Sequence, residues 1–405
     1  MEHGQTSTGG LSRRRFLKLC AVGGCGLYLA LAGLPGCALL RERDSRRPPD
    51  GNQGVVPEPG DGTAAKGFVR PEASPWYVAL GQDRVECQLC PRRCRLASGE
   101  RAPCRVRENR AGTLYTLAYG NPALVQEDPV ERMPFFHVVP GSRALAVSTA
   151  GCNLACEFCE VWDMALVAPE DVYAYDMPPE RIVSQAEASR VRSVSYAFGE
   201  PAVFQEYAWA TAKLAREAGL LNLLHTAGYI EPEPLAQLAE LVDGANVDLK
   251  SFDPDFYRQV VGGELEPVLR TLKLLQQAGV HLEITNIVIP TLNDAPELIR
   301  EMCSWIVAEL GNDVPLHFAR FYPLYRLSAL PRTPVSSLDA AREQALAAGL
   351  NYVYVAKVTG HDGENTFCPN CGRTVIKRVG FVVAEVHMLD GACGHCGTAI
   401  PGIWK

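Results

Sequence analysis

The sequence predicts an α/β fold in which helices cover a parallel sheet. From about residue 144 to residue 358, short apolar or β-branched runs alternate with stretches of helical periodicity. Hydrophobic residues make up 47% of the 405-residue chain and charged residues 21%, which is the composition of a globular protein. This alternation is typical of βαβ units, arranged as an open doubly wound sheet or as a full or partial barrel.

The individual elements follow from these runs. We expect strands at Ala144–Ala150, Ser193–Phe198, Leu221–Thr226, Ala245–Leu249, Leu282–Ile289, Pro315–Phe321 and Tyr352–Val358. Helical periodicity predicts helices at Val203–Ala218, Glu266–Ala278, Pro296–Leu310 and Ser337–Ala348. Ligands bind at the carboxyl ends of the strands in either architecture, so we look for functional residues there.

The first forty residues have the layout of a signal segment or membrane anchor. A basic cluster, Ser12 to Lys18, precedes an apolar run of small residues that extends to about Ala32. Its paired arginines resemble a twin-arginine signal, which directs the export of folded proteins, and an ordinary secretory signal is the alternative. Because residues 34–37 resemble a lipoprotein cleavage box ending at Cys37, we expect a membrane-associated or exported protein, and a lipoprotein.

Composition divides the rest of the chain. Residues 41–67 are rich in Pro, Gly and charge and predict a flexible linker. We expect a Cys-rich region at 68–140, the α/β core at 141–360 and a metal-binding ribbon at 361–405. Because residues 1–50 hold eight Lys or Arg against four Asp or Glu, the net charge of -7 becomes -11 over the remaining 355 residues. A body this acidic does not predict a nucleic-acid partner.

Three cysteines follow the first expected strand, at Cys152, Cys156 and Cys159. Thiolates this close can each bind a different iron of one [4Fe–4S] cube, and no fourth cysteine follows nearby, so one iron is left open. An open metal position distinguishes a reactive site from a closed structural one. The alternatives are a zinc site completed by a distant ligand and buried cysteines that pack as hydrophobic residues.

Two Cys-x2-Cys knuckles near the carboxyl terminus supply four more thiolates, from Cys368 and Cys371 and from Cys393 and Cys396. Paired knuckles are typical of a tetrahedral four-sulfur site, most often with zinc. Iron takes the same ligands, and disulfides are the alternative in an exported protein. Between the knuckles, Val379–Val386 predicts one strand of a small ribbon.

A third group of cysteines lies within eighteen residues near the start of the Cys-rich region, at Cys87, Cys90, Cys94 and Cys104. Its irregular spacing suits either a second zinc ion, which we take as the first expectation, or an auxiliary iron–sulfur cluster. Cys303 lies in an expected helix and predicts a core residue.

The ordered motifs resemble a known family. The Cys-x3-Cys-x2-Cys spacing of the central cysteines, with aromatic Phe158 before the last of them, resembles the signature of radical S-adenosylmethionine (SAM) enzymes. Over residues 80–405 the chain resembles AmmeMemoRadiSam system radical SAM enzymes, which are relatives of pyruvate formate-lyase activating enzymes. This likeness is carried by Cys87–Cys94, Gly151–Trp162, Asp248–Lys250, Gly363–Cys371 and Pro401–Trp404.

The resemblance implies a radical SAM partial (β/α) barrel, a [4Fe–4S] cluster and SAM. One electron from a low-potential donor would cleave SAM to methionine and a 5′-deoxyadenosyl radical, which abstracts hydrogen from an unidentified protein or small molecule. A glycyl-radical-enzyme activase is the alternative within this class. A non-catalytic zinc or iron–sulfur interaction module is the alternative of another class. No acid or base is needed, so no catalytic side chain is assigned.

The same resemblance implies where SAM is held. The expected contacts are Phe158, Gly199, Glu200, Asp248, Lys250 and His317. Gly199 and Glu200 follow the second strand, where the family contacts the SAM amino group. Asp248 and Lys250 are two residues apart on a strand, so both side chains project from one face, toward a polar cofactor rim or the barrel interior. His317 lies on the sixth strand and could contact SAM or the substrate, and the alternative is a hydrogen-bonded core residue, which a lone histidine more often is.

Two segments depart from the family pattern near the expected ligand rim. Thr226–Tyr229 lacks the asparagine that would precede its glycine, and residues 356–358 lack the usual asparagine of that strand end. For this reason the resemblance does not identify the substrate.

Overall fold

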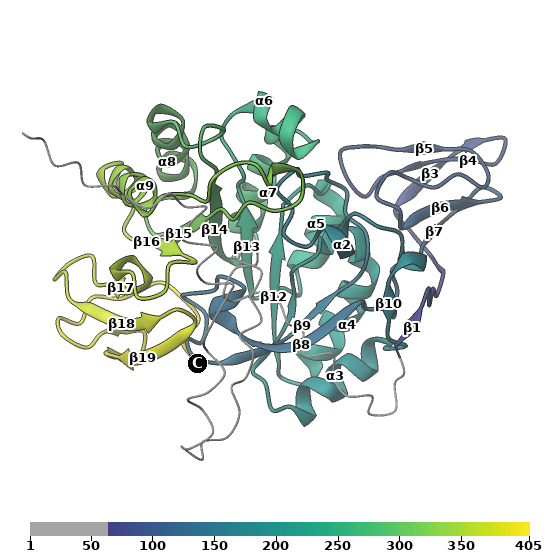
Figure 1. Ribbon diagram of the computed structural model, residues 1–405. Coiled ribbons are helices and arrows are strands. Elements are labelled where there is room, and N and C mark those ends of the chain that lie inside the picture. The colour runs from purple at the N-terminus through teal and green to yellow at the C-terminus, as the bar shows by residue number, and fades with distance from the viewer. Residues whose placement is uncertain (1–63) are drawn as a thin grey trace, which may run out of the picture. The chain divides into compact units, whose positions relative to one another are not determined.

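The computed structural model describes residues 64–405 (Figure 1). The expected signal segment, the lipoprotein box at Cys37 and most of the linker lie outside these residues. Strand β1 (Ala65–Lys66) lies at the end of the expected linker and pairs with β10 (Tyr173–Ala174). Within residues 64–405, none of the helices combines the length and the hydropathy that crossing a bilayer requires.

An eight-stranded sheet forms the centre of the described structure, in the order β16-β15-β14-β13-β12-β11-β9-β8. Neighbouring strands are parallel except for the antiparallel pair of β8 and β9. All seven expected strands are present within two residues of their expected bounds. They are β9 (Arg143–Ser148), β11 (Ser193–Tyr196), β12 (Leu221–Thr226), β13 (Gly244–Asp248), β14 (His281–Val288), β15 (Leu316–Arg320) and β16 (Val353–Ala356). The eighth strand of the sheet, β8 (Leu124–Pro129), was not expected.

Six helices follow or separate these strands and lie outside the curved sheet (Figure 1). They are α3 (Pro179–Ala188), α4 (Gln205–Glu217), α5 (Pro232–Ala239), α7 (Leu265–Gln277), α8 (Pro296–Leu310) and α9 (Val335–Ala347). Helices α3 and α5 were not among those expected from the sequence. Both begin in Pro-rich segments, where proline suits the first helical turn because its missing N–H has no helical partner.

Strand β9 shows how the sheet divides its two faces. Leu145 and Val147 are buried in the main core with the helices, whereas Ala144 and Ala146 belong to a second core with Phe135. Successive side chains of a strand point to opposite faces, which produces this alternation. The sheet is therefore buried on both faces, and functional groups are left to the strand ends and the inner polar positions.

Smaller sheets carry the two outer cysteine groups. The N-terminal ones have the orders β3-β4-β5 (Tyr77–Gly81, Arg84–Cys87, Arg95–Leu96) and β2-β7-β6 (Glu72–Ala73, Thr113–Thr116, Arg107–Arg110). The C-terminal ones are β17-β18-β19 (Thr366–Phe367, Thr374–Val379, Val382–Val386) and β20-β21 (Met388–Leu389, Ala392–Cys393). The single strand expected at 379–386 is wrong, because Gly380 adopts a φ of +61° and turns the chain into a hairpin.

Candidate metal centre and cofactor site

The central cysteine loop (residues 149–161) starts where β9 ends. Cys156 is buried, and Cys152 and Cys159 are partly exposed. The N–H of Cys159 donates to the Cys156 carbonyl (3.2 Å), and the N–H of Leu154 donates to Cys152 Sγ (3.4 Å). All three thiols are thus held by one compact loop at the carboxyl end of the sheet, where the sequence analysis expected them.

A short π-helical turn, Tyr257–Val261, holds the outer side of this loop. The N–H groups of Ala155 and Glu157 donate to the carbonyls of its last two residues, each at 2.9 Å. Gly263 permits the close approach, since a Cβ there would lie 2.6 Å from the Leu154 side chain. The loop is therefore fixed by backbone contacts that do not depend on the thiols.

Asp248 and Lys250 are together beside the loop, as the sequence analysis expected. Lys250 Nζ lies 3.0 Å from Asp248 Oδ2 and 5.7 Å from the centre of the Phe158 ring. His225 Nε2, at the end of β12, lies 3.1 Å from the other Asp248 oxygen. His225 was not among the expected site residues, although it lies near the carboxyl end of an expected strand, where functional residues are sought.

Asp248 and Lys250 each keep the other in its charged form. Burial raises the pKa of Asp248, but Lys250 and His225 outweigh it and the pKa falls well below its usual range. Burial lowers the pKa of Lys250, yet the Asp248 carboxylate outweighs that and raises it. Lys250 is therefore a permanent cation whose side chain is 10% exposed, at the rim of the cysteine loop.

Gly199 and Glu200 connect the ends of three neighbouring strands. The N–H of Gly199 donates to Ser148 Oγ (3.0 Å), and a Cβ at this glycine would lie 2.3 Å from that oxygen. The Glu200 carboxylate accepts hydrogen bonds from Thr226 Oγ1 (2.6 Å) and from the N–H of Ala227 (2.8 Å). Burial raises the pKa of Glu200, and these hydrogen bonds oppose it. Glu200 thus fixes the strand ends against which a ligand would lie.

Burial raises the pKa of all three central thiols, that of Cys159 to about 12. Glu200 raises the pKa of Cys152 further, whereas the Lys250 cation lowers that of Cys156. Metal binding must therefore displace protons from these groups, as it does at thiolate sites generally. Lys250 supplies the nearby positive charge that favours the thiolates.

His317 belongs to another cluster. It is the second residue of β15 and fully buried, with Nε2 2.7 Å from Glu283 Oε2 and its ring stacked on Tyr354. Its contacts within residues 64–405 join it to the inner polar positions near the amino ends of the strands. The structure does not bring it together with the central cysteine loop.

The four C-terminal thiols converge as their spacing predicts. Their sulfur atoms all lie within 4.8 Å of one another, with 3.5 Å between Cys368 and Cys396 and 3.8 Å between Cys371 and Cys393. A hydrogen bond with Thr398 lowers the pKa of Cys396 to about 6. This arrangement can hold one metal ion in a tetrahedral sulfur site.

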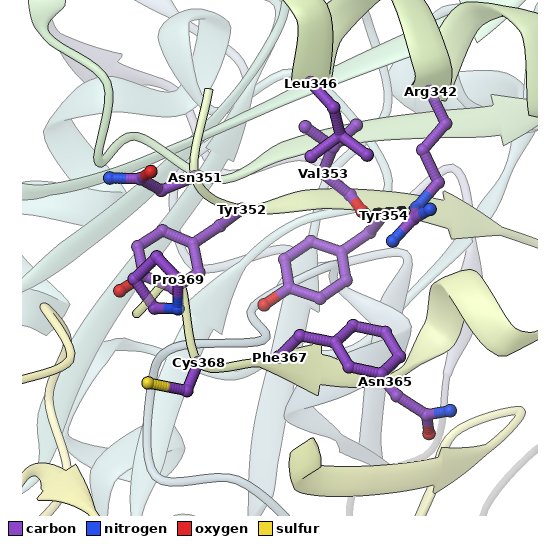
Figure 2. A pocket seen from close by; sticks show the side chains of 10 residues that line it. All are labelled: Arg342, Leu346, Asn351, Tyr352, Val353, Tyr354, Asn365, Phe367, Cys368 and Pro369. Atoms are coloured by element: carbon purple, nitrogen blue, oxygen red, sulfur yellow. Dashed lines mark hydrogen bonds between the residues drawn. The ribbon is translucent and has the colours of Figure 1, made fainter. Parts of the chain in front are cut away.

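A pocket lies beside this C-terminal site, between α9, β16 and the strand that precedes Cys368 (Figure 2). Figure 2 shows Tyr352, Tyr354 and Phe367 around it, with Arg342 at one side. None of the expected SAM contacts lines it, so we do not assign it to the cofactor.

Comparison with known proteins supports the assignment of the central loop. The model of the radical SAM superfamily matches residues 146–303, which include all three central cysteines and the Asp248–Lys250 pair. An uncharacterized protein of Methanocaldococcus jannaschii, MJ0808, is 40% identical over 328 residues, 80% of this chain and 97% of that protein. The chain belongs to the radical SAM superfamily.

Two activating enzymes show more distant similarity. A pyruvate formate-lyase-activating enzyme of Clostridium pasteurianum is 27% identical over 177 residues, covering 43% of this chain and 72% of the enzyme. The solved domain of a pyruvate-formate lyase-activating enzyme from Bacteroides vulgatus aligns with a TM-score of 0.37 and 14% identity, over 40% of this chain and 98% of the domain. The superfamily assignment rests on the sequence comparisons.

Membership of this superfamily implies a [4Fe–4S] cluster and SAM, and the residues fit both. Three thiols on one loop supply one ligand each to three irons, and the loop is held without them. Lys250 offers an ammonium group to a carboxylate, and Glu200 is a buried acceptor after β11, which is separated from β13 by β12 alone. The donor set therefore matches the groups that the superfamily holds.

Proposed function

We propose that this protein is a radical SAM enzyme that abstracts hydrogen from a protein or a small molecule. The observation that carries the proposal is the meeting of three cysteines on one loop with Lys250, which lies beside the loop over the ring of the loop residue Phe158. When bound, the cluster supplies the electron that cleaves SAM to methionine and a 5′-deoxyadenosyl radical. The protein's own residues bind, orient and shield the cofactor.

Lys250 is suited to bind the SAM carboxylate. Its ammonium group is nearly buried, so its hydrogen bonds are little screened by water. Asp248 accepts one N–H of Lys250 and His225 holds the other Asp248 oxygen, which fixes the direction of the remaining donors. Glu200 and Gly199, at the end of β11, would contact the SAM amino group.

The substrate class is a narrower proposal. Similarity to a pyruvate formate-lyase-activating enzyme favours a glycyl-radical-enzyme activase as the second candidate. The ordered motifs favour the AmmeMemoRadiSam group, for which we propose an unidentified protein or small-molecule substrate. The departures at Thr226–Tyr229 and at residues 356–358 fall at strand ends, where a substrate would be recognised.

We further propose that the C-terminal cysteines hold zinc and that the amino-terminal segment attaches the protein to the membrane. The support for zinc is that the two Cys-x2-Cys knuckles bring four sulfur atoms together around one position. Attachment follows from the twin-arginine-like segment and the lipoprotein box at Cys37. Fractionation that found the full-length protein freely soluble in the cytosol would rule out attachment.

The test is a SAM-cleavage assay on anaerobically reconstituted protein. With dithionite as the electron source, wild-type protein should form 5′-deoxyadenosine and methionine. Cys156→Ala should form neither and yet retain the metal of the C-terminal site. If wild-type protein that contains its irons cleaves no SAM, the proposed function is wrong.

A further inference from the structure

The four N-terminal cysteines gather on tight backbone turns. The N–H of Cys87, at the end of β4, donates to the carbonyl of Cys94 at 2.9 Å. The N–H of Arg93 closes a turn onto the Cys90 carbonyl at 3.1 Å, and a similar turn, closed at 2.9 Å, carries Cys104. Cysteines separated by irregular sequence spacing are thus assembled by two small sheets and their connecting turns.

These thiols are buried and unbridged. The exposed fractions are 5% for Cys87, 8% for Cys90 and 7% for Cys104, and Cys94 is partly exposed. No disulfide joins cysteines anywhere in residues 64–405. Four thiols in one largely buried group, each in electrostatic contact with another, have the chemistry of a metal site rather than of a packed core.

A buried cation lies next to the group. The Arg107 side chain is 1% exposed and pairs with Glu206, with Nη2 2.7 Å from Oε2. Burial opposes its charge, but Glu206 and then the thiols of Cys87 and Cys104 raise the pKa of Arg107, so it stays protonated beside them. Its Nε is buried and has no hydrogen-bond partner in the structure. The N–H of Arg107 Nε is therefore available to donate a hydrogen bond to a sulfur of an anionic metal centre.

Convergence of the sulfurs on one ion position distinguishes the C-terminal cysteines from the N-terminal ones. Zinc–sulfur bonds of about 2.3 Å place the four sulfurs of a tetrahedral site within about 4 Å of one another. The C-terminal cysteines are preformed in this way, within 4.8 Å. Within residues 64–405 the C-terminal four are the cysteines that converge in this way, whereas the N-terminal four, like the three central cysteines, do not form such a group. A multinuclear cluster, in which each thiolate binds a different iron, needs the wider arrangement.

The group also contacts the central cysteine loop on both sides of Cys152. A Cβ at Gly151 would lie 2.6 Å from Val106 Cγ1 and 2.8 Å from the carbonyl oxygen of Cys104. On the other side, Arg92 Nε donates to the Asn153 carbonyl at 2.6 Å. Burial raises the pKa of Cys90 to about 12, and the Asn153 side chain is among the groups that oppose this rise. The two cysteine groups therefore share their supporting backbone.

We propose that Cys87, Cys90, Cys94 and Cys104 bind a second iron–sulfur cluster, packed directly behind the loop of the radical SAM cluster. This reverses the first expectation of zinc. The reasons are that these four thiols are not preformed around one ion position as the C-terminal four are, that the buried Arg107 keeps an unpartnered Nε beside them, and that their turns contact the central cysteine loop. The proposal concerns a separate metal centre and does not depend on SAM cleavage.

The test measures iron, sulfide and zinc in anaerobically reconstituted full-length protein. Wild type should contain about eight irons per chain, and the triple variant Cys152→Ser/Cys156→Ser/Cys159→Ser about four, with a Mössbauer spectrum of an iron–sulfur cluster. The double variant Cys90→Ser/Cys104→Ser should also contain about four irons. Cys303→Ala is the matched control, because it removes a buried cysteine of α8 that belongs to none of the three cysteine groups. This variant should keep the wild-type iron content.

The triple variant decides the question even if the double variant does not fold. An iron-free triple variant with two zinc ions, or with the C-terminal metal alone, would overturn the second cluster. SAM cleavage by wild type is measured on the same sample. A protein that cleaves SAM with only four irons refutes the second cluster, whereas eight irons without cleavage refute the proposed function.

Discussion

Gly151 packs against the backbone of Cys104 so closely that an added methyl group would lie 2.8 Å from the Cys104 carbonyl oxygen. The two residues belong to cysteine groups that are far apart in the sequence, and Gly151 directly precedes the first central cysteine. Its φ of +95° also favours glycine. This contact makes the position of Cys152 depend on the N-terminal cysteine turns.

Gly151→Ala should therefore weaken the central cluster. The substitution combines backbone strain with overlap against Val106 and Cys104, and we expect a loss of roughly 2 kcal/mol or more in unfolding free energy. Central-cluster iron after reconstitution should fall with it. Gly219→Ala is the control, because its φ is +76° with nothing within 4 Å of the added Cβ. Equal losses in the two variants would show that the Cys104 contact has no effect.

Lys250→Gln should weaken both folding and SAM binding. It leaves the buried Asp248 carboxylate without its cation, which costs about 1–3 kcal/mol of unfolding free energy. A lost charged hydrogen bond should also weaken SAM binding about tenfold or more, measured by equilibrium dialysis. Lys273→Gln, which breaks an exposed pair with Glu309, should change neither by a measurable amount. Unchanged SAM affinity in Lys250→Gln would remove Lys250 from the site.

Cys371→Ser should remove one metal ion per chain without changing the central cluster. The substitution takes one of the four converging sulfurs from the C-terminal site, whose supporting strands are separate from the central loop. Metal analysis should show the loss, and iron content and SAM cleavage should stay at wild-type values. Loss of central iron in this variant would mean that the two centres are not independent.

Acid should destabilise the fold through His137. Burial lowers the pKa of this histidine to about 3, and in the folded state its ring nitrogens lie 2.6 Å from the Pro401 carbonyl oxygen and from the Tyr354 hydroxyl. In the unfolded chain its pKa is about 6.5, so the neutral ring stabilises folding above that pH. Between about pH 6.5 and 3 the unfolded chain takes up a proton that the folded protein does not.

The expected slope from this one residue is up to about 1.4 kcal/mol of unfolding free energy per pH unit. His137→Gln should be less stable at pH 7 but should lose stability less steeply between pH 6 and pH 4. Chemical denaturation of the wild type and of His137→Gln at each pH gives the difference between their unfolding free energies. Carboxylates that titrate in both proteins contribute equally to both values and cancel in this difference. Parallel slopes would show that His137 is not held neutral.

Much of the core could be predicted because its signals are local. Buried parallel strands are apolar runs, and the cysteine spacing marks the loop after β9. Helices α3 and α5 were not predicted because both begin with prolines, and proline occurs in turns as well as in the first turn of a helix. Contacts between residues far apart in the sequence could not be predicted, because they leave no pattern in either segment alone. The approach of Gly151 to Cys104 and the pairing of His225 with Asp248 arise only when segments far apart in the sequence meet in the folded chain.

The open iron is tested most directly by electron-nuclear double resonance of the reduced protein with SAM labelled in its carboxylate and amino groups. The Cys90→Ser/Cys104→Ser variant gives the central cluster alone. We expect hyperfine coupling from both labels, which shows SAM bound to one iron, and no such coupling in Cys156→Ala. A wild-type cluster that forms fully but shows no coupling to labelled SAM would contradict the account.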